Sequence, residues 1–143
     1  MDNIEFFMFK PDAVENGLVG ASLQRVEDAG LRVVAMKLIN VSKKQAEELY
    51  SPHKGKDFYE SLTEYIRSGP VIVSVLSGKN AVKTTRDLMG APNPLEAKPG
   101  TIRGDFAESI IQNVVHGGDS PENARRELKL FFDEDELNLD IQK

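Results

Sequence analysis

The sequence predicts an α+β fold built on a four-stranded antiparallel sheet. Three observations lead there: the chain has 143 residues, 40% of them are hydrophobic, and short strand-like apolar runs alternate with stretches of helical spacing. The order is strand, helix, strand, two helices, strand, helix, strand and helix. This is the split βαβ order of a ferredoxin-like βαββαβ sandwich, with helices on one face of the sheet. We expect a single domain over residues 1–143.

Strands are expected where short apolar runs are bounded by Pro or Gly, at residues 4–9, 31–39, 71–76 and 113–116. The first is rich in aromatic residues and stops before Pro11. The second follows Gly30, which is placed to end the preceding helix in a left-handed conformation. The third lies between Ser68-Gly69-Pro70 and Gly78, and Gly117-Gly118 breaks the fourth.

Helices are expected over about residues 19–29, 42–50, 57–67, 80–89 and 120–132. Ser42 with Gln45, and Asp57 with Glu60, have the spacing of capping boxes, which begin the second and third helices. Ser120-Pro121 gives the last helix an N-cap and a proline at its first position. Residues 91–104 carry three prolines and two glycines, which predicts a long loop. We expect no regular structure in the acidic tail from about residue 133.

Composition and charge exclude several classes of function. Eighteen Lys and Arg against 23 Asp and Glu give a net charge of −5, which excludes a uniformly basic nucleic-acid binder. Cysteine is absent, and two histidines are too few for a three-His zinc site. The N-terminus lacks the basic region of a signal peptide, and no apolar run approaches a membrane span. We therefore expect a cytoplasmic protein that binds neither membrane nor specific nucleic acid.

His116 is the strongest candidate for chemistry. It ends a short apolar strand, precedes two glycines that allow close approach of a ligand, and lies before the positive end of the last helix. On that helix Glu127 falls about 60° from Ala124, at the border of the buried stripe. A half-buried carboxylate there needs a partner, which would be the His116 ring or, alternatively, Arg125, Arg126 or a neighbouring lysine. The other histidine, His53, is expected to be exposed in a loop.

Three cations beside punctuating residues are candidates for binding polyphosphate. Lys10 directly precedes Pro11, Arg86 lies on the border of the helix over 80–89, and Arg103 lies in the long loop. Each alone is more often a solvated surface charge, but together they would supply the charge and bidentate donors that polyphosphate needs. Asn113, three residues before His116, is either a ligand for ribose or phosphate or simply a turn residue.

These residues lie in segments that resemble the nucleoside diphosphate kinase family over about residues 4–132. The most specific segments are Pro99-Gly100-Thr101-Ile102-Arg103-Gly104-Asp105-Phe106 and Asn113-Val114-Val115-His116-Gly117. The resemblance implies transfer of the γ-phosphoryl of a nucleoside triphosphate to a nucleoside diphosphate, by a ping-pong mechanism through a phosphohistidine at His116. It further implies Mg²⁺ carried by the nucleotide phosphates and a homo-oligomer, either tetramer or hexamer.

The resemblance also implies roles for individual residues. Those that would perform or support the chemistry are His116, Glu127, Lys10 and Tyr50. Those that would hold the nucleotide are Lys10, Phe58, Arg86, Pro92, Arg103, Ile110 and Asn113. Phe58 would stack on the base with Ile110 opposite, and stacking tolerates every base because each has a π-face. The cations would neutralise charge on the transferred group.

Two positions depart from the family's pattern. Pro92 stands where the family usually has a threonine that donates to a phosphate, and proline has neither hydroxyl nor N–H. Gly118 stands where the family usually has a serine whose hydroxyl bridges toward the glutamate. We therefore expect Gly118→Ser to raise the rate of phosphohistidine formation modestly. The alternative function is a catalytically weakened, nucleotide-binding regulatory or interaction module of the same fold.

Overall fold

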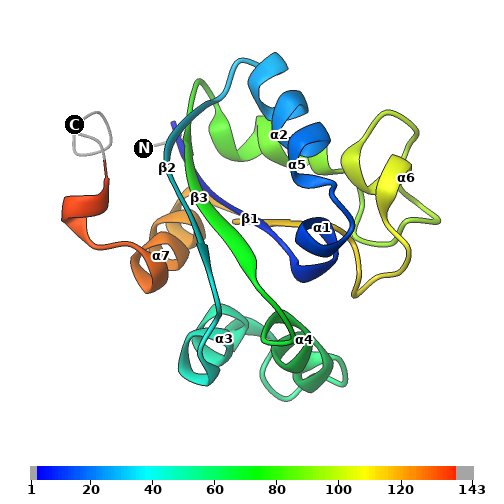
Figure 1. Ribbon diagram of the computed structural model, residues 1–143, viewed down its shortest axis with the longest axis vertical. Helices are drawn as coiled ribbons and strands as arrows, with labels where there is room; N and C mark the ends of the chain where they lie inside the picture. Colours follow the sequence, from blue (N-terminus) through cyan, green and yellow to red (C-terminus); the bar gives the residue numbers. More distant parts are fainter. Residues whose placement is uncertain (1–2, 138–143) are drawn as a thin grey trace.

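The computed structural model describes residues 3–137, and an antiparallel sheet of order β2-β3-β1-β4 lies at its centre (Figure 1). Its strands are β1 (Ile4–Phe9), β2 (Arg32–Ile39), β3 (Val71–Ser77) and β4 (Val115–Gly117). β1 pairs with β3, with Ile4 opposite Ser77, and on its other side with β4, with Met8 opposite His116. The predicted α+β, ferredoxin-like fold is confirmed.

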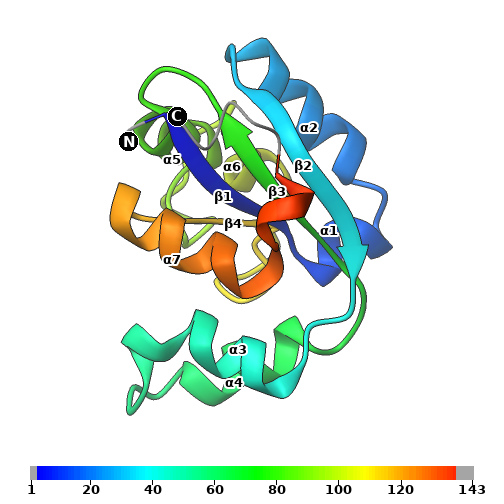
Figure 2. The ribbon, with the colours of Figure 1, turned by 90° about the vertical axis from the view of Figure 1, so that its left-hand side faces the viewer.

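The helices of the described residues surround this sheet. They are α1 (Pro11–Glu15), α2 (Val19–Asp28), α3 (Lys43–Leu49), α4 (Tyr59–Ile66), α5 (Ala81–Met89), α6 (Ile102–Phe106) and α7 (Pro121–Phe131), with 3₁₀ turns η1 (Ser51–His53) and η2 (Glu134–Glu136). Figure 2 shows α7 in front of β1 and β4, and α3 with α4 below the sheet. None of these helices is long and apolar enough to cross a membrane.

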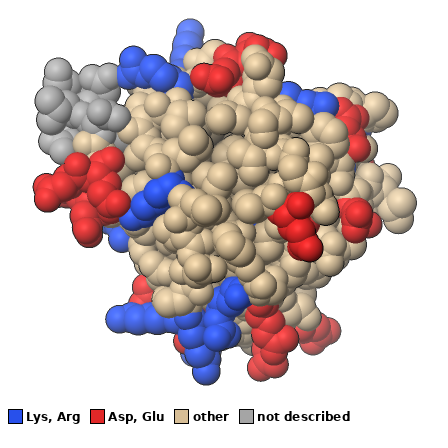
Figure 3. Space-filling model, viewed as in Figure 1, with Lys and Arg blue, Asp and Glu red and all other residues tan. Residues whose placement is uncertain are grey.

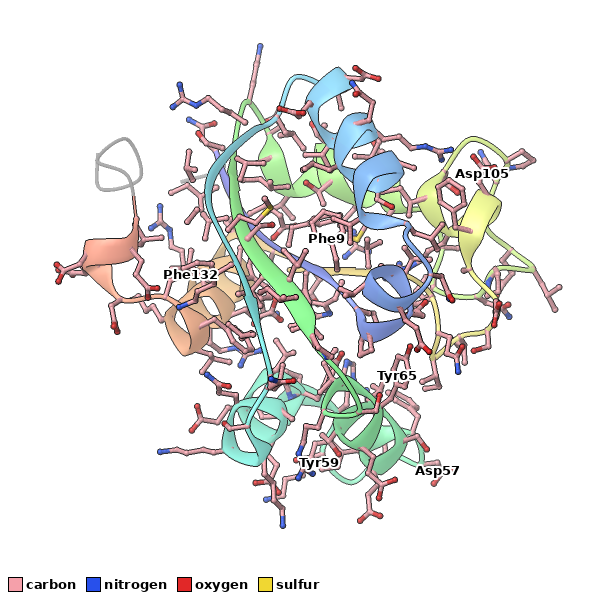
Figure 4. The ribbon with its side chains drawn as sticks, viewed as in Figure 1. Phe9, Asp57, Tyr59, Tyr65, Asp105 and Phe132 are labelled. Carbon is pink, nitrogen blue, oxygen red and sulfur yellow. The ribbon has the colours of Figure 1, made fainter. Side chains whose placement is uncertain are left out.

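Helices cover both faces of the sheet, which corrects the expectation of one covered face. All six residues of β1 are buried. Phe6 and Met8 belong to a core cluster with residues of α3, α4 and α7, whereas Phe7 and Phe9 belong to a second cluster with residues of α1, α2 and α5. Because strand side chains alternate between faces, one fully apolar run supplies both clusters. Phe9 points into the second of them (Figure 4).

Local signals set some helix boundaries as predicted and others differently. The Ser42–Gln45 capping box is present and begins α3. The predicted box at Asp57 and Glu60 is wrong, because the N-cap of α4 is Phe58 and no side chain that the structure describes caps this helix. Helix α1, whose first residue is Pro11, was not predicted.

The loop predicted over residues 91–104 is shorter than expected. Arg103 belongs to the short helix α6, whose N-cap Thr101 accepts the Gly104 N–H at 3.0 Å through its hydroxyl. The strand expected over 113–116 is displaced to 115–117. The two most specific segments meet, because the Arg103 side chain donates to the carbonyls of Asn113 and Val115.

Part of the acidic tail is ordered against the sheet. Residues 134–136 form η2, and the Lys37 ammonium on β2 lies 2.6 Å from a carboxylate oxygen of Glu136. Leu137 packs against the core that contains α7. Figure 3 shows the acidic side chains of this turn gathered at its left edge. The expectation of an unstructured tail is therefore wrong for residues 133–137, and the remainder lies outside the described residues.

Candidate active site

A cavity of about 750 Å³ opens where β4, α7, the end of α5 and the end of α3 converge. Six of the predicted site residues line it: Tyr50, Arg86, Pro92, Arg103, His116 and Glu127. The four others lie elsewhere: Lys10 and Asn113 are buried, and Phe58 and Ile110 are exposed. The fold thus joins residues more than sixty positions apart in one pocket.

His116 and Glu127 form the pair that the helical spacing predicted. Nε2 of His116 lies 2.9 Å from Oε1 of Glu127, and the two side chains are 19% and 6% exposed. A carboxylate at this distance accepts a hydrogen bond from an Nε2–H group, which leaves the lone pair on Nδ1. Arg126, one of the rival partners, lies 3.6 Å from the other carboxylate oxygen and donates to backbone carbonyls of Glu48 and Leu49.

The backbone just before His116 is strained. Val114 has φ of 76°, a conformation that β-branched residues rarely adopt, and the Val115 N–H donates to the Asn113 carbonyl at 2.9 Å to close a tight turn. The Val114 N–H donates to Oδ2 of Asp12 at 3.0 Å. Oδ1 of Asp12 accepts the hydroxyl of Tyr65 at 2.9 Å, and Figure 4 shows Tyr65 reaching from α4 toward α1. Asp12 therefore holds the strained turn in place.

Arg103 is a fixed cation in the cavity wall. Its guanidinium donates to the carbonyls of Asn113, Gly90 and Val115, at 3.3, 3.1 and 2.8 Å. Burial lowers its pKa to about 10, so the group remains charged at neutral pH. Three bonds use only part of the five N–H donors of an arginine. Arg86, from α5, is exposed and lines the same cavity.

Lys10 and Asn113 form a buried polar cluster beside the cavity. The Lys10 ammonium donates to Oδ1 of Asn113 at 2.8 Å and to the Ile111 carbonyl at 2.6 Å. Burial first, and Arg103 second, lower the pKa of Lys10 to about 7. Nδ2 of Asn113 donates to the Pro92 carbonyl at 3.1 Å. Pro92 therefore orients Asn113 through its carbonyl, and because proline has no N–H or hydroxyl it cannot donate to a phosphate.

Aromatic side chains form the opposite wall and the margin of the cavity. Tyr50 meets the His116 ring edge-on with centroids 5.8 Å apart. Phe58 is 43% exposed, and its ring lies 5.2 Å from that of His53. His53 itself lines the cavity and is only partly exposed, so its prediction as an exposed loop residue is wrong. The signal available in the sequence was its closeness to Tyr50 and Phe58.

Gly118 needs no hydroxyl to connect the pair, because Nε2 and Oε1 meet directly. A Cβ on Gly118 would lie 2.9 Å from both the backbone nitrogen and the Cα of Ala124, and 2.8 Å from Oε1 of Glu5. A serine would therefore have to displace α7, which contradicts the expectation that Gly118→Ser speeds the reaction.

Comparison with known proteins gives one consistent result. The family model described as nucleoside diphosphate kinase matches residues 3–137. A nucleoside diphosphate kinase of Archaeoglobus fulgidus is 52% identical over 132 residues, covering 92% of this chain and 87% of that protein. One from Campylobacter jejuni is 55% identical over 130 residues, covering 91% and 95%.

Solved structures agree with the sequence comparisons. The halophilic nucleoside diphosphate kinase of Halobacterium salinarum, in complex with CDP, superposes with a TM-score of 0.92 at 41% identity, covering 96% of this chain and 92% of that one. The Aquifex aeolicus enzyme gives a TM-score of 0.92 at 33% identity, covering 95% and 99%. With a histidine and a glutamate paired in a cavity that Arg86 and Arg103 also line, this chain belongs to the nucleoside diphosphate kinase family, whose members are phosphotransferases acting on nucleotides.

Proposed function

We propose that Nδ1 of His116 is the nucleophile of a two-step phosphoryl transfer. In the first step Nδ1 bonds to the γ-phosphorus, the bond to the bridging oxygen breaks, and the nucleoside diphosphate leaves with that electron pair. In the second, a terminal phosphate oxygen of another nucleoside diphosphate attacks the phosphorus and releases the histidine. The hydrogen bond from Nε2 to Glu127 carries the proposal, since it fixes the tautomer that leaves Nδ1 nucleophilic.

The three cations would hold the phosphates and stabilise charge in the transition state. Arg103 is already oriented by three carbonyls, so little reorganisation is needed when the phosphate arrives. Arg86 is exposed in the cavity and free to adjust. Lys10, with its pKa lowered to about 7, would gain its full charge when an anionic phosphate lies nearby.

The nucleoside would lie at the margin of the cavity. Phe58 and Ile110 are 43% and 57% exposed, and each would offer an apolar surface to the base. Asn113 and Lys10 would donate to the ribose. No cluster of three or more His, Cys, Asp or Glu side chains among residues 3–137 could hold a metal, and Mg²⁺ would enter on the nucleotide phosphates.

The chain would act in the cytoplasm as a homo-oligomer, tetramer or hexamer. β2 is an edge strand of the sheet, and Met36 and Leu38 on it are 46% and 61% exposed. An edge strand with exposed apolar residues favours pairing with another chain. We expect Leu38→Glu to lower the mass measured by light scattering; an unchanged mass would rule out assembly through this edge.

The nucleophile is tested by incubating the protein with γ-labelled ATP. We expect label that is stable to alkali and labile to acid, located on the peptide containing His116. His116→Ala should abolish labelling while ADP still binds, and Glu47→Gln, at an exposed position on α3, serves as the control. Labelling retained in His116→Ala would refute the mechanism. A wild type that binds ADP and takes no label would be the regulatory module instead.

A further inference from the structure

Glu5 is a buried carboxyl with no part in the site as described so far. It lies on β1 and has no exposed surface. Its Oε1 accepts the backbone N–H groups of Phe6 and Gly118, at 2.9 and 3.0 Å. Its Oε2 is buried and has no hydrogen-bond partner among residues 3–137. A buried polar atom without a partner is costly, so this arrangement calls for a reason beyond packing.

The carboxyl of Glu5 touches the link that joins His116 to the helix of Glu127. That link is Gly117-Gly118, which follows His116 on β4 and leads into α7. A Cβ on Gly117 would lie 3.2 Å from Oε2, and one on Gly118 would lie 2.8 Å from Oε1. The Gly118 position also abuts the backbone of Ala124, one helical turn before Glu127. Glu5 thus occupies the room that a side chain at position 118 would need.

Within the described part of the chain, two charged groups act on the Glu5 carboxyl. Glu127 lies on α7, and Arg86 lies on α5. Burial, followed by the charge of Glu127, raises the pKa of Glu5 to about 9, against the opposing effect of the two N–H groups and of Arg86. The carboxyl is therefore neutral at pH 7. An ionised Glu5 would place a second negative charge near the pocket that must admit an anionic phosphate.

We propose that Glu5 is a positioning residue for phosphoryl transfer, which holds Gly117-Gly118 so that Nε2 of His116 and Oε1 of Glu127 stay in contact. The proposal rests on the role proposed above for His116. The neutral carboxyl of Glu5 holds the Gly117-Gly118 link without adding charge, whereas the ionised carboxylate at alkaline pH opposes the approach of phosphate. Gly118 and Glu5 act as a matched pair, because the missing side chain of one makes room for the other.

Two variants test whether Glu5 positions the Gly117-Gly118 link or only fills space beside it. Glu5→Ala removes the acceptor of two N–H groups, and we expect phosphohistidine formation to slow about tenfold at saturating ATP with ADP affinity unchanged. Glu5→Gln keeps an acceptor oxygen and does not ionise, so it should recover most of that loss. Glu47→Gln removes an exposed carboxylate and is the matched control.

The pH dependence of phosphohistidine formation is the second measurement, because a side chain that only filled space would not change it. Wild-type protein should lose rate as the pH rises through the Glu5 pKa of about 9, because the carboxylate form then accumulates. Glu5→Gln should lack this decline. Lys10 also titrates, with a pKa lowered to about 7, but it is common to both proteins and cancels in the comparison.

Each outcome decides the proposal. The proposal is overturned if Glu5→Ala forms phosphohistidine as fast as wild type. It is also overturned if the rates of wild type and Glu5→Gln fall equally at alkaline pH. If Glu5→Ala does not fold, the comparison of wild type with Glu5→Gln remains. If wild type forms no phosphohistidine, the role of His116 fails separately. Positioning is then measured by the ¹⁵N shifts of the His116 ring, which report whether Nε2 donates to Glu127. Identical shifts in wild type and Glu5→Ala would overturn the proposal.

Discussion

Replacing Glu5 by glutamine should stabilise the protein more and more as the pH rises. The folded-state pKa of Glu5 is about 9, against an ordinary value of 4.5. Between these two values the folded protein binds one more proton at this site than the unfolded chain does. Stability contributed by the protonated carboxyl is therefore complete below the unfolded pKa and is lost as the pH rises toward the folded one.

The size of the effect follows from the gap between the two pKa values. Each pH unit in this window removes about 1.4 kcal/mol from the free energy of unfolding, so wild type at pH 7 has lost about 3 kcal/mol. Glutamine does not titrate. The difference in unfolding free energy between Glu5→Gln and wild type should therefore grow by about 4 kcal/mol from about pH 5 to about pH 8.

Urea denaturation of both proteins across this range measures the difference. One protein concentration must be used throughout, because the stability of an oligomer depends on it. Glu47→Gln, which removes a carboxylate from the surface, should give a difference that stays nearly constant with pH. If the Glu5→Gln difference is equally constant, Glu5 is ionised in the folded protein and the reasoning from burial is refuted.

Three other predictions concern Lys10, Arg25 and Tyr65. ADP binding should take up protons just above pH 7, because Lys10 has a pKa lowered to about 7 and regains its proton beside phosphate. Calorimetry in buffers of different ionisation enthalpy measures the proton uptake, and zero uptake would contradict the prediction. Arg25→Ala should lower the free energy of unfolding by about 1–2 kcal/mol and expose residues 91–101 to proteases. Arg25 pairs with Asp105 at 2.8 Å, donates to the Gly100 carbonyl and lies over the Phe106 ring. An unchanged cleavage pattern would mean that other contacts hold the loop. Tyr65→Phe should cost about 1 kcal/mol, seen as a lower denaturation midpoint, since Asp12 loses the hydroxyl; no change would show that this bond contributes no net stability.

The fold could be predicted because its signals are local. The run of residues 4–9, the Ser42–Gln45 box and Ser120-Pro121 each specify an element within a few residues. Errors arose where a local signal was ambiguous. Asp57 and Glu60 have the spacing of a capping box, but the helix begins at Tyr59 with Phe58 as its N-cap. The glycines around Arg103 suggested a loop where Thr101 caps α6.

Site residues could be predicted from the sequence only where the geometry of a single helix or strand was enough to place them. Helical geometry placed Glu127 on the flank of α7, and the structure puts it 2.9 Å from His116. Glu5 was missed, although a lone carboxylate in an apolar strand was a usable signal. Its meaning depends on Gly118, 113 positions away, and on α7 lying against both. Contacts of this kind come from the tertiary arrangement of strands and helices, which sequence spacing does not contain.

The three carbonyls held by Arg103 also determine how the pocket can open. They belong to Gly90 at the end of α5 and to Asn113 and Val115, which lie in one turn leading into β4. One buried guanidinium therefore joins three stretches of chain: its own helix α6, the end of α5 and residues 113–115. No one of these stretches can move away without leaving a buried charge short of acceptors. The walls of the pocket should therefore open together in a single cooperative event. In hydrogen exchange, protected amides in these three stretches should share one opening free energy.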